Sequence, residues 1–365
     1  MNLDDTPLFK KIDTLDMLAE IDGLPAQLQS AWDLGRGQPL PEVKGITRVV
    51  LSGMGGSAIG ADLLAAYIAP LCGLPVFVQR DYGLPAWAAG AETLVIASSH
   101  SGNTEETLDS FESALHSGCR LMAVATGGAL AERARAEKVP IWQFTHAGQP
   151  RAAVGFSFGL LLSAFDRLGL IPAQGQALQA AVEDMQAQQK SLHADVPAVH
   201  NPAKRMAGQM MGRWVNVFGT GGLAPVARRW KTQVNELAKA GAGFEILPEA
   251  NHNTLTGTFN PAETLTHTTS LFLRAPSDHP RNRRRLDLTR QAFMLEGLNT
   301  DVYDAPGAGP LSHIWTALHF GDYSAYFLAM AYATDPTPVP VLENFKASMK
   351  SSPTGTSSPK GKAAK

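Results

Sequence analysis

Short runs of hydrophobic and β-branched residues alternate with helix-like stretches along most of the chain. The first series, between residues 46 and 145, is ITRVVLSG, LPVFVQRD, TLVIASS, CRLMAVAT and VPIWQFT. Hydrophobic strands this short, separated by helical segments, are typical of a parallel sheet covered by helices on both faces. A second series contains WVNVFGT, FEILPE, TSLFLRA and NTDVYDA. The order of elements therefore predicts two doubly wound α/β units and suggests an internal duplication.

Three further stretches have helical periodicity. Residues 6–34, interrupted at Gly23 and Pro25, predict one or two helices packed on the outside of the first unit. Residues 153–170 are hydrophobic but broken by glycine and serine, which favours a buried helix that closes this unit over a membrane span. The polar stretch 173–194 predicts a helix that connects the two units.

The chain length supports two domains, since 365 residues exceed the roughly 100 to 200 residues of an ordinary domain. We expect an N-terminal domain with leading helices over residues 1–170 and a C-terminal domain over residues 171–350. Residues 351–365, SSPTGTSSPKGKAAK, contain no hydrophobic anchor and predict a disordered tail.

The composition argues against several function classes. The 31 basic and 33 acidic residues give a net charge of −2, so no overall field attracts nucleic acid or an anionic membrane. Cys72 and Cys119 form no CxxC pair, which argues against a zinc ribbon or a disulfide framework and fits a reducing compartment. The acidic N-terminus lacks the regions of a secretory signal. We expect a cytoplasmic protein that binds neither nucleic acid nor a membrane.

A glycine-rich segment, GMGGSAIG from Gly53 to Gly60, follows the first strand and opens a helix. Glycines such as Gly55 and Gly56 let the backbone turn tightly and approach a ligand, and a helix N-terminus offers free N–H groups to an anion. Ser57 adds a hydroxyl group. A purely structural turn and a loose dinucleotide-binding fingerprint are alternatives for this segment on its own.

A second loop, SSHSGNT from Ser98 to Thr104, follows the third strand and precedes the helical EETLDSFESAL. The hydroxyls of Ser99, Ser101 and Thr104 can surround one phosphate, whereas helix capping explains only one of them. Both loops follow the carboxyl ends of strands in one sheet, where they converge on a single crevice. Together they predict a phosphate-binding cradle.

The two loops resemble those of the sugar isomerase (SIS) family of phosphosugar-binding domains, in which a segment like GMGGSAIG is followed by SxSGNTEET. This resemblance implies that Ser57, Ser99, Ser101 and Thr104 hold the phosphate of a sugar-phosphate substrate. Relatives usually carry tyrosine where His100 stands, so this side chain departs from the family pattern.

Further along, VFGTGGLAPVARRWKTQVNELAKAGAGFEILPEANHNTLTG resembles the second domain of the bifunctional phosphoglucose/phosphomannose isomerases. The resemblance covers residues 45–348 and implies two SIS-type domains. It also implies interconversion of glucose 6-phosphate, and of mannose 6-phosphate, with fructose 6-phosphate without a cofactor. Glu236 matches the family's proton-transfer base, His252 its ring-opening histidine and Arg151 its intermediate-stabilising arginine. Lys346 matches a lysine near the ring oxygen or C1.

The chemistry of the implied reaction needs these residue types in any protein. One carboxylate, here Glu236, can lift the C2 proton and return it to C1 of a cis-enediolate. His252 can exchange a proton at the ring oxygen near neutral pH, and the fixed charge of Arg151 stabilises the enediolate. Each residue also has a structural alternative. Glu236 could be a solvated helix residue and His252 a loop-capping side chain. Arg151 could be a surface ion-pair partner, and Lys346 a side chain at a helix end that extends to solvent.

The family pattern bears on specificity as well. It implies a threonine beside the intermediate, where a small polar residue lets the enediolate rotate so that both aldoses react. Thr337 fits this position, with Val339 as the alternative when counting back from the C-terminal lysine. Leu237 and Thr254 depart from the pattern, because relatives often have asparagine and glutamate there.

The resemblance implies a homodimer in which the loop histidine acts in the partner's site. No metal is indicated, because neither HxH, HExxH nor a cysteine cluster occurs. An NAD(P)-dependent oxidoreductase is one competing class, but Asp81 lies 28 residues after Gly53, farther than the roughly 20 residues expected. A non-catalytic sugar-phosphate sensor is another, although no helix-turn-helix output element is apparent.

Overall fold

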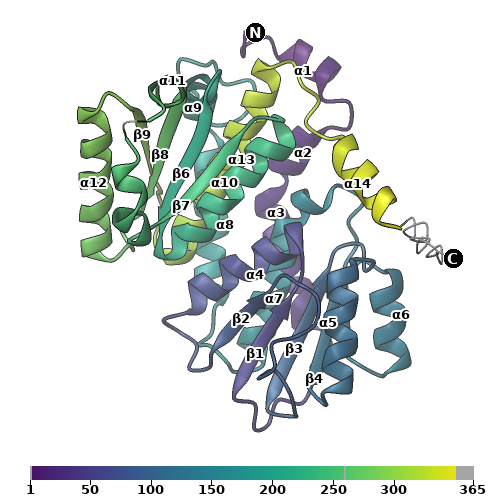
Figure 1. The fold of residues 1–365 in the computed structure, drawn as a ribbon. Helices are drawn as coiled ribbons and strands as arrows, with labels where there is room; N and C mark the ends of the chain where they lie inside the picture. The colour runs from purple at the N-terminus through teal and green to yellow at the C-terminus, as the bar shows by residue number, and fades with distance from the viewer. Residues whose placement is uncertain (1, 259, 351–365) are drawn as a thin grey trace, which may run out of the picture.

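A computed structural model describes residues 2–258 and 260–350 of the chain, and the predicted tail lies outside this part. The described residues form two lobes, each built on one parallel β-sheet (Figure 1). The first sheet has the strand order β2-β1-β3-β4-β5. Its strands are β1 (Arg48–Ser52), β2 (Val76–Gln79), β3 (Thr93–Ser99), β4 (Arg120–Ala125) and β5 (Ile141–Gln143).

The second sheet has the strand order β7-β6-β8-β9, which repeats the order of the first four strands of the other sheet. This repetition agrees with the duplication expected from the order of elements. Each hydrophobic run predicted as a strand overlaps a strand of the structure. The second set is β6 (Trp214–Thr220), β7 (Ala242–Leu247), β8 (Thr268–Arg274) and β9 (Asn299–Asp304).

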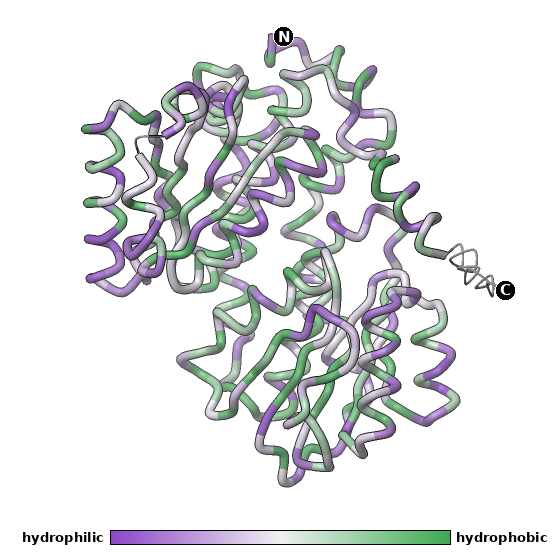
Figure 2. The backbone as a smooth tube through the Cα atoms, viewed as in Figure 1, coloured by the Kyte–Doolittle hydropathy of each residue, from purple (hydrophilic) through white to green (hydrophobic). Residues whose placement is uncertain are grey.

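Helices cover both faces of the first sheet, as expected for a doubly wound fold. Alternate strand residues point to opposite faces. Val49 therefore joins a core with α7, whereas Val50 joins a separate core with Phe111 of α5. Figure 2 shows β1, β3 and β4 as mainly hydrophobic. The helices are α3 (Leu24–Arg36), α4 (Gly55–Ile68) and α7 (Val154–Arg167) on one face and α5 (Glu105–His116) and α6 (Gly128–Ala136) on the other.

The second sheet is covered in the same way. On one side, α13 is buried along almost its whole length, which is why its sequence is hydrophobic all round. On the other side α12 packs its apolar residues against Phe218 and Phe272. The elements are α8 (Gly175–Gln189), α9 (Pro202–Met210), α10 (Ala224–Leu237), α12 (Pro280–Leu295) and α13 (Pro310–Ala331), with the short helix α11 (Ala262–Thr266).

The N-terminal segment agrees in part with its prediction. It forms three helices: α3 packs against α7 of the first unit as expected, whereas α1 (Thr6–Ile12) and α2 (Met17–Asp22) lie against α13 of the other lobe. The Phe9 ring lies 6.1 Å from the Tyr326 ring, and His319 Nε2 lies 2.8 Å from the carbonyl oxygen of Ile21. The reason is that the apolar face of α13 needs cover, and residues close in sequence do not supply it.

The two lobes contact each other through α4 and α10. Arg228 Nη1 of α10 lies 2.9 Å from Asp62 Oδ2 of α4, and Arg80 at the end of β2 pairs with the same carboxylate. This shared ion pair therefore joins two helices. One is α4, which begins in the glycine-rich loop, and the other is α10, which carries Glu236. The last helix, α14 (Pro340–Lys350), lies at the edge of the molecule (Figure 1).

Candidate active site

The glycine-rich loop lies against two other loops at the carboxyl end of the first sheet. A Cβ atom built at Gly53 would come within 2.8 Å of the Ser98 carbonyl oxygen, and one at Gly56 within 2.4 Å of the Pro150 carbonyl oxygen. Gly55 has a φ of +51°, in the left-handed region that favours glycine. Glycines are therefore needed here so that three backbone segments can approach one another.

Two hydroxyls of the second loop, those of Ser99 and Thr104, turn towards one another. Ser99 Oγ and Thr104 Oγ1 lie 2.9 Å apart, and Ser57 Oγ accepts a hydrogen bond from the His100 N–H at 3.1 Å. Thr104 occupies the N-cap position of α5, yet its side chain makes no capping bond. Helix capping therefore does not account for the threonine hydroxyl. Ser101 is exposed and its Oγ accepts from the Asn103 N–H at 3.2 Å.

The position of this cradle follows from the sheet order. β1 pairs with β2 on one side and β3 on the other, so the connections after β1 and β3 leave in opposite directions. In open parallel sheets ligands bind in the crevice that opens at such a point. The start of α4 supplies its free backbone N–H groups to this crevice.

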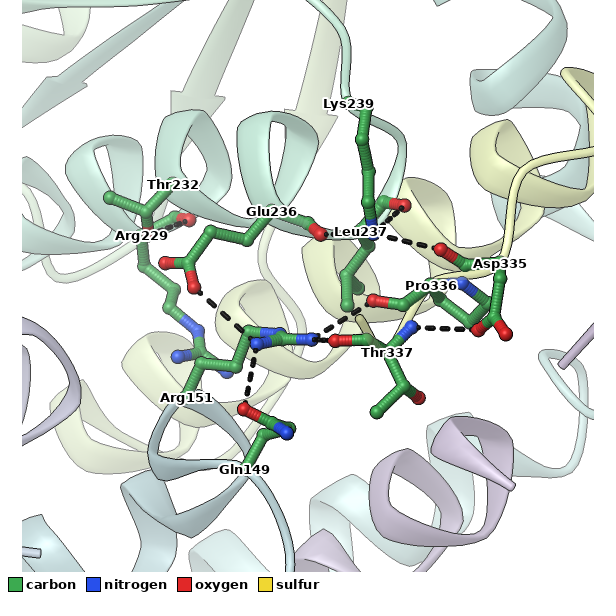
Figure 3. A network of polar contacts seen from close by, with 10 residues as sticks. All are labelled: Gln149, Arg151, Arg229, Thr232, Glu236, Leu237, Lys239, Asp335, Pro336 and Thr337. Carbon is green, nitrogen blue, oxygen red and sulfur yellow. Dashed lines mark hydrogen bonds and ion pairs between the residues drawn. The ribbon is translucent and has the colours of Figure 1, made fainter. Parts of the chain in front are cut away.

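Arg151 and Glu236 form an ion pair (Figure 3), and the Arg151 backbone lies against Gly56 of the glycine-rich loop. Arg151 lies in the 3₁₀ turn Pro150–Ala153, which contacts the start of α4, and its side chain is 4% exposed. Its Nη1 lies 3.5 Å from Glu236 Oε2, on the last turn of α10. Burial lowers the pKa of Arg151, and the charge of Glu236 opposes that shift.

The Arg151 guanidinium is held by backbone oxygens and keeps one donor unused. Nη2 donates to the carbonyl oxygens of Pro336 and Thr337, and Nη1 lies 3.3 Å from Gln149 Oε1. Nε is buried without a hydrogen-bond partner among the described residues. A buried guanidinium N–H without a partner is rare in proteins, and it can donate to an oxygen of a bound ligand.

Lys239 adds a second cation to this cluster, and the sequence analysis missed it. Its Nζ donates to the carbonyl oxygens of Glu236 and Asp335, both at 2.8 Å, so it joins the end of α10 to the segment that carries Thr337. Burial and the charge of Arg151 lower the pKa of Lys239 to about 8. Its φ of 53° is unusual for a residue with a side chain. The only signal in the sequence was a lysine three residues after Glu236.

Thr337 lies beside Arg151, as the contact through its carbonyl oxygen shows. Its side chain is buried, and Oγ1 has no hydrogen-bond partner among the described residues. Val339 is half-buried and makes no polar contact with Arg151. Of the two candidates for the specificity position, Thr337 is thus the one in contact with the arginine.

Two predicted site residues do not join this cluster. His252 is exposed in the 3₁₀ turn Glu249–His252 after β7, whereas Glu236 precedes β7. A six-residue strand spans roughly 20 Å, so the two side chains lie at opposite ends of β7. Lys346 is exposed on α14, with no ion pair or hydrogen bond to the described residues. The apolar residues Val341 and Phe345 of this helix are also exposed.

The described ranges lack the features of two other classes of site. In residues 2–258 and 260–350, no group of three or more His, Cys, Asp or Glu side chains has the arrangement of a metal site. Within the same ranges no helix combines the length and hydrophobicity needed to cross a bilayer. Asp81, the acid considered for ribose binding, accepts from the backbone N–H of Tyr82 at 2.8 Å.

The chain is similar to known proteins in sequence and in fold. A family model described as the bacterial phospho-glucose isomerase C-terminal SIS domain matches residues 199–349. A glucose-6-phosphate isomerase like protein from Thermus thermophilus has the same fold, with a TM-score of 0.63 at 19% identity over 94% of this chain and 99% of that chain.

Two sequence relatives cover most of the chain. A bifunctional phosphoglucose/phosphomannose isomerase of Caldicellulosiruptor bescii is 36% identical over 334 residues, which is 90% of this chain and 98% of the relative. A protein of the same name from Aquifex aeolicus is 32% identical over 303 residues, 83% of this chain and 90% of the relative. The chain belongs to the bifunctional phosphoglucose/phosphomannose isomerase family.

Proposed function

We propose that the protein is an aldose–ketose isomerase that interconverts glucose 6-phosphate, and mannose 6-phosphate, with fructose 6-phosphate. The observation that carries the proposal is the Arg151–Glu236 pair, 3.5 Å apart beside the hydroxyl-lined cradle. The names of the relatives that cover most of the chain support the same reaction. A carboxylate, a fixed cation and a phosphate cradle are the groups that this chemistry needs.

In this mechanism Glu236 is the base. Its carboxylate takes the proton from C2 of the open-chain aldose and returns it to C1, while a hydroxyl proton moves from O2 to O1. The cis-enediolate between these steps carries negative charge. Arg151 stabilises that charge, and its unpartnered Nε–H is free to donate to one of the enediolate oxygens.

The phosphate is held away from the reacting carbons. Ser57, Ser99, Ser101 and Thr104 bind it together with the backbone N–H groups at Gly55 and Gly56. Binding energy from this group positions the sugar for the proton transfer. Neither a metal nor another cofactor takes part in the proposed steps, so a chelator is expected to leave turnover unchanged.

The sugar ring must open before isomerisation, and we assign that step to His252. Because His252 and Glu236 lie at opposite ends of β7, the proposal needs a homodimer in which His252 reaches the partner's site. Lys346 acts near the ring oxygen or C1 once α14 has packed against a site, and the exposed apolar side chains of α14 support such packing. Dimerisation and the cytoplasmic location stay predictions.

Dual specificity depends on a pocket beside C2 in which the enediolate can rotate. The buried, unpartnered Oγ1 of Thr337 next to Arg151 supports this residue as the specificity position, because it can hold a water there. The test follows fructose 6-phosphate formation from each aldose with a chelator present. We expect activity on both aldoses, and Thr337→Val should lower mannose 6-phosphate turnover more than glucose 6-phosphate turnover.

Three results would favour a function other than the proposed one. Turnover of glucose 6-phosphate alone would leave a single-specificity isomerase and remove the role of Thr337. Saturable binding of fructose 6-phosphate without any turnover would favour a sugar-phosphate sensor. Saturable nicotinamide cofactor binding, seen by fluorescence, would favour the oxidoreductase.

A further inference from the structure

Three side chains next to the cradle form a chain of hydrogen bonds. His100, in the loop after β3, has its Nε2 3.0 Å from Nδ1 of His146, in the loop after β5. The other ring nitrogen of His146 lies 3.1 Å from Glu20 Oε2 of α2. The chain thus runs from a carboxylate near the surface to the loop that carries Ser99 and Ser101.

Aromatic rings enclose the two histidines. Phe144 and Phe156 stack with centroids 4.9 Å apart; the His100 ring lies 5.8 Å from Phe144 and the His146 ring 6.0 Å from Phe156. The His146 side chain is 8% exposed. In the described part of the chain, the ionisable groups in contact with the two imidazoles are each other and Glu20. The aromatic rings lack charges, so they add no further ionisable group to the pair.

The carboxylate fixes the direction of the hydrogen bonds when the pair is neutral. Glu20 can only accept, so Nε2 of His146 carries a proton. Nδ1 of neutral His146 then has a lone pair and accepts from the Nε2–H of His100. In this state Nδ1 of His100 has no proton and can only accept a hydrogen bond.

One added proton reverses the direction of the hydrogen bond between His146 and His100. His146 becomes an imidazolium beside the Glu20 carboxylate, and its Nδ1–H donates to Nε2 of His100. The proton of His100 then sits on Nδ1, which becomes a donor although His100 itself stays neutral. Burial and the charge of His146 lower the pKa of His100 to about 4, which disfavours a positive charge on His100 itself.

The backbone of His100 lies in the loop that carries the cradle hydroxyls. The His100 backbone is fixed on both sides, since its N–H donates to Ser57 Oγ and its carbonyl oxygen accepts from Thr126 Oγ1 at 2.7 Å. Nδ1 is the ring nitrogen nearest the backbone, so it stays close to this loop. It makes no hydrogen bond to the described residues and is not among their buried unpartnered atoms, which leaves it open to solvent.

We infer that Glu20, His146 and His100 form a proton-coupled anion switch. Binding of a phosphate dianion in the cradle draws one proton onto His146 and turns His100 Nδ1 into a donor to the anion. His100 is then a binding residue, and Glu20 and His146 are positioning residues. The inference rests on the phosphate cradle of the proposed function and adds a proton to its binding step.

The test uses sulfate as the probe, because sulfate stays a dianion from pH 6 to 9 and any proton taken up must go to the protein. Calorimetric titrations in two buffers with different ionisation enthalpies measure the protons bound with sulfate. Above the pKa of the free switch, we expect uptake of about one proton and a Kd that rises about tenfold per pH unit. Binding should be strongest below that pKa.

Four variants separate the switch from a structural role. Glu20→Gln and His146→Gln should abolish proton uptake and flatten the pH dependence of Kd. His100→Asn offers an amide donor near the position of Nδ1, so it should bind sulfate without a proton. His100→Gln offers its amide near the position of Nε2 and should bind sulfate at least tenfold more weakly than His100→Asn. Thermal melting shows whether each variant folds.

The wild-type protein alone can overturn the inference. Sulfate binding without proton uptake at any pH from 6 to 9 would refute the switch and leave the phosphate cradle intact. Absence of sulfate binding would refute both the switch and the cradle. Proton uptake that persists in folded Glu20→Gln and His146→Gln would assign the proton to another group and also refute the switch.

Discussion

The ion pair of Arg151 and Glu236 joins two residues whose roles, but not whose contact, could be predicted from the sequence. Each residue type followed from the chemistry and the family pattern, whereas the 3.5 Å contact depends on how the two lobes pack. Lys239 and the chain from Glu20 to His100 were missed for the same reason. Their partners come from distant segments, and no local spacing signals such contacts.

Replacing the proposed base tests the mechanism most directly. Glu236→Gln keeps the shape of the side chain but cannot accept the C2 proton, so turnover should fall by about 10²- to 10⁴-fold. Exchange of the C2 proton with solvent should disappear as well, while sulfate binding stays within a few-fold of the wild type. Glu296→Gln, which changes an exposed residue at the end of α12 away from the Arg151–Glu236 pair, is the control. Near-normal turnover of Glu236→Gln would remove it from the mechanism.

The hydroxyl cradle leads to a prediction about binding of the sugar phosphate. Ser99→Ala combined with Thr104→Ala removes two hydroxyls that lie 2.9 Å apart, and KM for the sugar phosphate should rise at least tenfold with the pH profile unchanged. Thr107→Val is a matched control, because the Thr107 hydroxyl is buried in α5 without a partner. Steady-state kinetics measure the effect. An unchanged KM in the double variant would show that the hydroxyls do not hold the phosphate.

At the scale of elements, prediction succeeded where the pattern was local. The strands of both sheets are short hydrophobic runs between turns, and their period identifies them without knowledge of the fold. The first two helices, α1 and α2, were misplaced because their partner, α13, lies about 300 residues away in the sequence. Because of the same separation in sequence, the buried polar contact between His319 and α2 could not be predicted.

That contact predicts how α2 and α13 respond to acid. Burial lowers the pKa of His319 to about 4, whereas the unfolded chain keeps the ordinary value near 6.5. The unfolded chain therefore binds more protons between these values, so the free energy of unfolding decreases as the pH falls from 6.5 to 4. The two values correspond to a loss of roughly 3 kcal/mol.

Urea denaturation at pH 7 and at pH 4.5 measures this loss. His319→Gln keeps an amide N–H for the Ile21 carbonyl but has no group to protonate, so its free energy of unfolding should depend less on pH. His116→Gln, which changes an exposed histidine of α5, should behave like the wild type. Equal pH dependence in His319→Gln and the wild type would show that His319 is not responsible for the acid sensitivity.

In the whole molecule, the described part of one chain does not bring together all the groups that the proposed mechanism needs. The cradle, Arg151 and Glu236 meet where the two lobes touch, through the α4–α10 contact and the Asp62 ion pairs. His252 lies at the far end of β7 and faces solvent. A second copy of the chain is the simplest source of a histidine for each site, and the family pattern implies the same arrangement.

Mixed dimers test this sharing of sites. Glu236→Gln and His252→Ala chains are each expected to be inactive, but a dimer with one of each contains one site with both wild-type groups. Exchange of subunits should therefore restore activity, up to about half the wild-type value for each verified mixed dimer, because one of its two sites is complete. As a control, a chain with both substitutions mixed with either single variant should restore nothing, since no site is then complete. Verified mixed dimers without any activity would show that His252 does not act across subunits, and a monomer with full turnover would show that each chain supplies every group it needs.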